Sequence, residues 1–93
     1  GRARKPDGGD GVRIQGPVRV AEGVELEDVV LGPNVTIGTG CKLRGVRIRD
    51  SIVGSHTTIE DSEIHDSLIG DRVRVRGVNG TLNVADDSEV LGG

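Results

Sequence analysis

Aliphatic residues recur along this chain at a spacing that fits neither a helix nor a long strand. From Ile14 to Val75, every fifth or sixth residue is Val, Ile or Leu. A helix repeats its apolar positions at three- and four-residue intervals, and a strand alternates them. The pattern therefore predicts a fold of short repeated units. The anchors of these units are Ile14, Val20, Leu26, Leu31, Ile37, Leu43, Ile48, Val53, Ile59, Ile64, Ile69 and Val75.

The length of a unit depends on its place within a group of three. The units that begin at Val20, Ile37, Val53 and Ile69 all have six residues, whereas most units of the other two sets have five. This sorting is expected if three units make one coil and like units stack on one another. The sequence thus predicts an all-β fold, a parallel β-helix in the form of a triangular prism, with about four and a half coils.

A second inward position lies two residues before each following anchor, and small side chains occupy it. Its members are Val18, Val24, Val29, Val35, Cys41, Val46, Ser51, Thr57, Ser62, Ser67 and Val73. Gly, Pro, Asn and Asp stand at the expected corners, where they make tight turns without strain. A prism this narrow accounts for the lack of Phe, Trp, Tyr and Met in all 93 residues.

Charged residues make up 29% of the chain, and the formal net charge is −3. The stacking places Glu27, Arg44, Glu60 and Arg76 in one column, so we expect a solvated ladder of alternating charge and not a binding patch. A negative chain without aromatic residues is not expected to bind nucleic acid. With no apolar run of membrane-spanning length, we expect no membrane partner and a cytoplasmic location.

The two ends depart from the repeat. Residues 1–11 contain no anchor and are predicted to be a flexible linker or tag remnant. Residues 12–79 form the predicted β-helix. The next anchor position falls on Gly80, so residues 80–93 are predicted to be a closing unit and C-terminal cap.

Units such as Leu31-Gly32-Pro33-Asn34-Val35-Thr36 resemble the hexapeptide repeat of left-handed parallel β-helices. The run IVGSHTTIEDSEIHDSLIG, residues 52–70, and the closing LNVADDSEV resemble the C-terminal domain of long-form glucose-1-phosphate thymidylyltransferases and related sugar-1-phosphate nucleotidyltransferases. The resemblance implies a left-handed coil and a non-catalytic tail that supports assembly. It places Mg²⁺ and the chemistry in a separate parent domain, and it makes a homo-oligomer or that catalytic domain the expected partner.

The residues themselves leave two other functions open. A hexapeptide-repeat acyltransferase would use an exposed His as general base, and the chain offers His56 and His65, which we expect to be ordinary surface residues. A non-enzymatic scaffold is the third reading. No phosphate-binding loop occurs, Cys41 is expected to be buried, and two histidines are too few for a three-His metal site. We therefore assign no catalytic, cofactor-binding or metal-binding residue.

Two aliphatic residues stand outside the inward pattern. Ile52 and Leu68 directly precede the anchors Val53 and Ile69 on stacked units, so both are expected to face outward at one corner. Aligned exposed aliphatics are a candidate contact surface. We expect the chain to associate with itself, or to pack on its parent domain, through these two residues.

Overall fold

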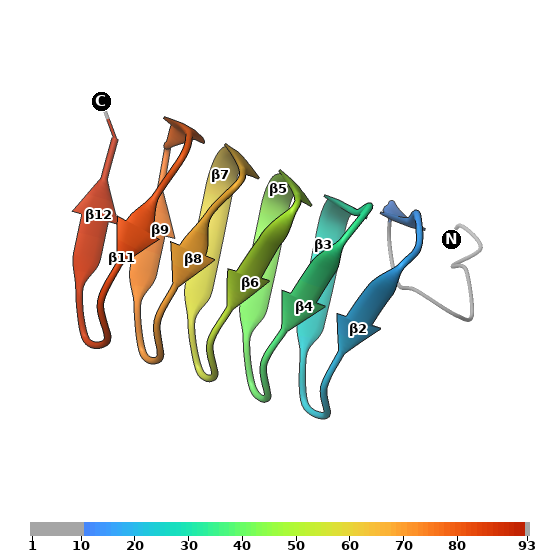
Figure 1. Ribbon diagram of the computed structural model, residues 1–93, viewed down its shortest axis with the longest axis horizontal. Helices are drawn as coiled ribbons and strands as arrows, with labels where there is room; N and C mark the ends of the chain where they lie inside the picture. Colours follow the sequence, from blue (N-terminus) through green and yellow to red (C-terminus); the bar gives the residue numbers. More distant parts are fainter. Residues whose placement is uncertain (1–10, 93) are drawn as a thin grey trace, which may run out of the picture.

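The structure is a computed structural model that describes residues 11–92, and these contain strands and turns without a helix (Figure 1). Parallel strands stack into a β-solenoid of about five turns. The strands are β1 Val12–Ile14, β2 Val18–Val20, β3 Glu25–Leu31, β4 Val35–Ile37, β5 Lys42–Arg49, β6 Ser51–Val53, β7 Thr58–His65, β8 Leu68–Ile69, β9 Arg74–Arg76, β10 Asn79–Gly80, β11 Asn83–Val84 and β12 Glu89–Leu91. The predicted fold class is confirmed.

The strands form three faces. One face is the sheet of five strands in the order β11-β8-β6-β4-β2. The other sheet runs β1-β3-β5-β7-β9-β12, with β10 beside β7, and it covers two faces because its long strands bend in the middle. The bends lie at Asp28, Gly45 and Asp61, whose φ angles are 55°, 65° and 50°. Gly and Asp tolerate this left-handed conformation, which turns the corner within one residue.

The register confirms that like units stack. Val18 pairs with Val35, 17 residues on, and Val35 pairs with Ser51, 16 residues on. The predicted charge column is also in register, since Glu27 pairs with Arg44 and Arg44 with Glu60. The Arg44 guanidinium lies 3.3 Å from the Glu60 carboxylate. Both side chains are partly exposed, as a solvated ladder requires.

The core consists of the inward columns. Nine anchors are at most 2% exposed: Leu31, Ile37, Leu43, Ile48, Val53, Ile59, Ile64, Ile69 and Val75. The first two anchors differ, because Ile14 is 55% exposed and Val20 is 36% exposed. Both belong to the first coil, and within residues 11–92 no further coil covers them. An anchor is buried by the coils on either side of it and not by its own unit alone.

Four buried hydroxyls take the place of Val in the inward columns: those of Ser51, Thr57, Ser62 and Ser67. Each donates to a backbone carbonyl and accepts from a backbone N–H of the following coil. Ser62 Oγ, for example, donates to Glu60 O at 2.8 Å and accepts from the Val78 N–H at 3.0 Å. Within the described part of the chain, no buried side-chain nitrogen or oxygen lacks a partner.

The chain keeps its coil across Gly80. Gly80 pairs with Ile64 through β10, and the next strand, β11, pairs with β8. The turn count is therefore about five, slightly above the four and a half predicted. Backbone pairing maintains the coil where the anchor side chain is missing.

Of the predicted linker, only Gly11 lies among the described residues, and there its carbonyl accepts from the Val29 N–H at 3.2 Å.

Candidate functional site

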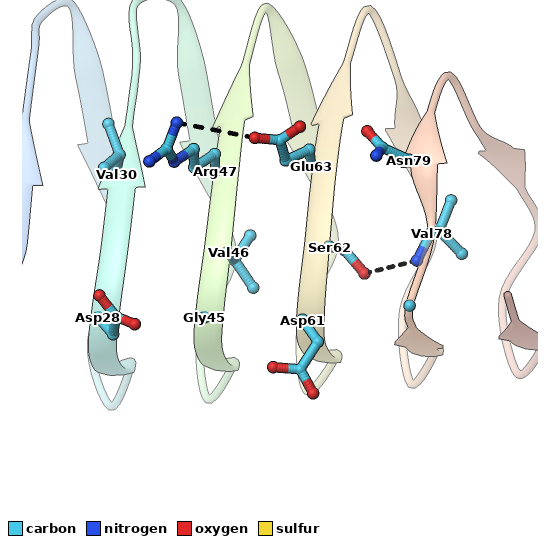
Figure 2. A pocket seen from close by; sticks show the side chains of 11 residues that line it. Asp28, Val30, Gly45, Val46, Arg47, Asp61, Ser62, Glu63, Val78 and Asn79 are labelled. Atoms are coloured by element: carbon cyan, nitrogen blue, oxygen red, sulfur yellow. Dashed lines mark hydrogen bonds and ion pairs between the residues drawn. The ribbon is translucent and has the colours of Figure 1, made fainter. Parts of the chain in front are cut away.

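The solenoid surface carries shallow depressions on its faces. One of about 390 Å³ lies over the bends of β3, β5 and β7 (Figure 2). In its middle, the Arg47 guanidinium lies 3.7 Å from the Glu63 carboxylate, so these two charges are already paired. Asp28 and Asp61 lie at the bends of β3 and β7, on one edge of this depression. Their backbones are two coils apart, a separation of about 10 Å. That distance is too long for one metal ion to bind both carboxylates.

No group of three or more His, Cys, Asp or Glu side chains suited to hold a metal is found within residues 11–92. The two carboxyls with displaced pKa values have structural partners. The Asn34 amide, followed by the Arg49 guanidinium, holds the pKa of Asp50 below its ordinary value. Arg72 does the same for Asp87 through two hydrogen bonds of 2.7 and 3.1 Å. A lowered carboxyl pKa is the opposite of what a general acid at neutral pH requires.

The two histidines lie on different parts of the prism. His56 is exposed at the corner between β6 and β7, with a φ of 56°, and its ring lies over Gly40 of the preceding coil. His65 ends β7 above Arg49, and its Nδ1 lies 2.9 Å from Asp66 Oδ2. As expected, they do not share one site.

Cys41 is buried, as the inward pattern predicts. It has no solvent exposure, and its thiol donates to Gly54 O at 2.9 Å. Burial is the main reason why the pKa of this thiol is raised above its ordinary value of 9.0. A buried neutral thiol is a poor nucleophile and a poor metal ligand.

This thiol predicts a pH dependence of stability. Above about pH 9 the unfolded chain loses the thiol proton while the folded chain keeps it, so the free energy of unfolding decreases as the pH rises. We expect urea unfolding between about pH 8 and about pH 10 to show a smaller decrease for Cys41→Val than for the unaltered chain. Equal decreases in the two proteins would contradict the assignment.

Ile52 and Leu68 are 53% and 52% exposed and pair with each other between β6 and β8. They lie on the flat five-stranded face and not at a corner, which corrects their predicted position. The reason is that the turn is made earlier, at Asp50 and Asp66, which both have φ angles of 49°. Thr36 continues the same outward column on β4. What binds to this column stays a prediction.

The sequence analysis missed Ile14 and Val20 as surface residues. Both fit the pattern of core anchors, yet Ile14 is 55% and Val20 is 36% exposed. The sequence could have indicated their exposure, because Ile14 and Val20 are the first two anchors of the series and no earlier anchor in the series stacks on them.

Comparison with known proteins gives two relatives. The chain is 34% identical over 64 residues to a glucose-1-phosphate thymidylyltransferase of Streptomyces antibioticus, covering 68% of this chain and 18% of that protein. It is 38% identical over 76 residues to the bifunctional protein GlmU of Carboxydothermus hydrogenoformans, covering 71% of this chain and 17% of that protein. No model of a protein family matches the chain.

These relatives confirm the resemblance to glucose-1-phosphate thymidylyltransferases that residues 52–70 and the closing LNVADDSEV run indicated. The chain is a homologue of a segment of a glucose-1-phosphate thymidylyltransferase. It spans less than a fifth of the length of either relative, so the similarity concerns a part of those proteins and not the whole.

Proposed function

We propose that this chain is the non-catalytic C-terminal β-helix domain of a sugar-1-phosphate nucleotidyltransferase, of the glucose-1-phosphate thymidylyltransferase type. The observation that carries the proposal is the similarity of this chain, over 64 residues, to a segment of such an enzyme. The chain has no phosphate-binding loop, and the Arg47 and Glu63 charges in the middle of the depression over β3, β5 and β7 are already paired. Its role is to assemble and support a catalytic domain, where Mg²⁺ and the reaction belong. We propose the cytoplasm as its location.

Residues 11–92 contain no helix that could span a membrane.

The decisive test is the coding sequence upstream of Gly1. We expect it to encode a Gly-rich nucleotide-binding loop in a preceding domain. The 93-residue chain itself is expected to transfer no nucleotidyl group between a nucleoside triphosphate and glucose 1-phosphate in the presence of Mg²⁺. Turnover by this chain would contradict the proposal, and so would an upstream sequence without such a domain. Acyl-CoA binding that disappears with His56→Ala or His65→Ala would select the acyltransferase instead.

The outward column of Ile52 and Leu68 is the proposed contact with the catalytic domain. Two aliphatic side chains offer far less area than the roughly 1,200 Å² that two free molecules usually bury in a stable complex. A domain in the same polypeptide loses less freedom on docking, so a small patch is enough to orient it. The sequence left self-association and domain packing open, and the small area favours domain packing.

This contact is tested in the complete enzyme. Ile52→Asp with Leu68→Asp is expected to lower the melting temperature of the catalytic domain by a few degrees, because two buried aliphatic contacts are lost. The β-type circular dichroism of the 93-residue chain stays unchanged, since neither side chain points into the prism. Val30→Asp, which changes an outward aliphatic residue of β3 on another face, is the matched control and leaves the melting temperature unchanged. A double variant that behaves like this control would exclude the contact.

A further inference from the structure

Asn79 and Gly80 form a chemically labile pair on the surface of the solenoid. The chain has three asparagines, and only Asn79 precedes a glycine. The other two precede valine, in Asn34-Val35 and Asn83-Val84. Asparagine is one of the residues that limit the lifetime of proteins at high temperature, because its side-chain amide can be lost. A following glycine favours this loss, since it has no Cβ to hinder the approach of its own nitrogen to the asparagine side chain.

The Asn79 side chain points outward and is accessible to solvent. Asn79 lies in β10, in register with Glu63 of β7, and both belong to the outward column of their face. The Glu63 side chain is 55% exposed although coils lie on both sides of it, so this column stays accessible even between two coils. In Figure 2 the Asn79 amide makes no interaction with the other residues drawn. By contrast, the Asn34 amide donates to Asp50 Oδ1 at 3.0 Å.

The strand pairing of β10 controls the reaction of this pair. The Glu63 N–H donates to Val78 O at 2.9 Å, and in a parallel pair this register directs the Gly80 N–H to β7 in turn. An extended backbone also holds the Gly80 nitrogen away from the Asn79 side chain, so ring closure requires that the two residues leave the sheet. β10 has only two residues, and Gly80 contributes no side chain to the core. Short, weakly packed segments of this kind open locally without unfolding of the whole protein.

We propose that Asn79 is a site of spontaneous deamidation, which local opening of β10 permits. The Gly80 nitrogen loses its proton to a base in the solvent and attacks Asn79 Cγ. A new C–N bond closes a succinimide ring, and the Cγ–Nδ2 bond breaks, so that ammonia leaves with a proton from the solvent. Water then opens the ring at either carbonyl and leaves aspartate or isoaspartate at position 79. Water is the only co-reactant, and the site is independent of the proposed function because it involves only these two residues.

Both products weaken the pairing of β10 with β7. Aspartate places a carboxylate beside Glu63, whose own charge is paired with Arg47 at 3.7 Å. Like charges on adjacent strands are destabilising. Isoaspartate carries the main chain through the former side-chain carbon, and the added backbone atom shifts Gly80 out of register with Ile64. The modification therefore loosens this coil slowly and irreversibly.

The test is prolonged incubation of the 93-residue chain at mildly alkaline pH, folded in buffer and unfolded in guanidinium chloride. Peptide mass spectrometry measures the conversion at each asparagine. We expect Asn79 to convert about ten- to a hundredfold more slowly in the folded chain than in the unfolded chain, because the pairing of β10 must first open. Conversion is slower at mildly acidic pH, since the attacking nitrogen must lose its proton.

The chain contains its own controls for this experiment. In the folded chain, Asn34 and Asn83 are each expected to convert at least about tenfold more slowly than Asn79, because a β-branched residue follows each of them. Asn79→Gln keeps an amide but lengthens the side chain, so it is expected to keep both its mass and its stability. Asn79→Asp is expected to match the aspartate product in urea unfolding, and the isoaspartate product, separated by ion exchange, is expected to be less stable than either.

Each other outcome overturns the proposal. A folded rate more than about a thousandfold below the unfolded rate would show that β10 stays closed. Equal conversion at Asn83 would show that the following glycine does not select the site. Products as stable as the unaltered chain would show that the modification does not loosen the coil. The proposed nucleotidyltransferase role stands or falls separately from all of these results.

Discussion

Replacing Ile59 by Ala is expected to lower the free energy of unfolding by about 2–5 kcal/mol. Ile59 has no solvent exposure and lies in an inward column between Leu43 of the preceding coil and Val75 of the following coil. The stacked backbones fix the distance between these neighbours, so the cavity left by the side chain cannot close. The change is measured by urea unfolding followed by circular dichroism.

The matched control for this experiment is Ile52→Ala, in the strand that precedes Ile59 along the chain. Ile52 is the same residue type, but it is 53% exposed and points away from the prism. We expect the control to change the free energy of unfolding by less than about 0.5 kcal/mol. Equal losses for the two variants would mean that the assignment of inward and outward positions is wrong.

Thr57→Val is expected to lower the free energy of unfolding by about 2–4 kcal/mol, although it keeps the shape of the side chain. Thr57 Oγ1 donates to Gly70 O at 2.8 Å and accepts from the Val73 N–H at 3.1 Å. These two partners belong to the following coil, a longer contact of 3.5 Å joins Oγ1 to Ser55 O, and Thr57 has no solvent exposure. Valine removes the hydroxyl, so the partly buried Gly70 carbonyl and the buried Val73 N–H each lose a hydrogen bond. The same urea unfolding experiment measures this loss.

Thr57→Ser separates the hydroxyl from the methyl group. Serine keeps both hydrogen bonds and loses one buried methyl, which costs about 1 kcal/mol. We therefore expect Thr57→Ser to be more stable than Thr57→Val. The reverse order would show that packing of the methyl group, and not the hydrogen bonds, is what this position contributes.

The fold could be predicted in detail because the lengths of the repeated units indicate which residues of neighbouring coils pair. The six-residue units recur at every third place, and this alone indicated that Ile37 stacks between Val20 and Val53, as the strand pairing shows. The small inward residues followed from the same count, and Cys41 and Thr57 are both fully buried. The outward direction of Ile52 and Leu68 was predictable for the same reason. Their place on a flat face depended on corner dihedral angles that the spacing does not contain.

The sequence by itself determined which side chains point into the prism and which charges stack, because both depend only on counting residues within a unit. The tertiary structure alone decided how far each inward side chain is shielded from solvent. Ile14 and Ile37 carry the same signal in the sequence, yet one is 55% and the other 1% exposed, because burial in a solenoid comes from the neighbouring coils. Backbone pairing likewise carries the coil across Gly80 without an anchor. The two shortest hydrogen bonds of the Thr57 hydroxyl, to Gly70 O and from the Val73 N–H, form only after the next coil is in place, since both residues lie more than ten positions further along the chain.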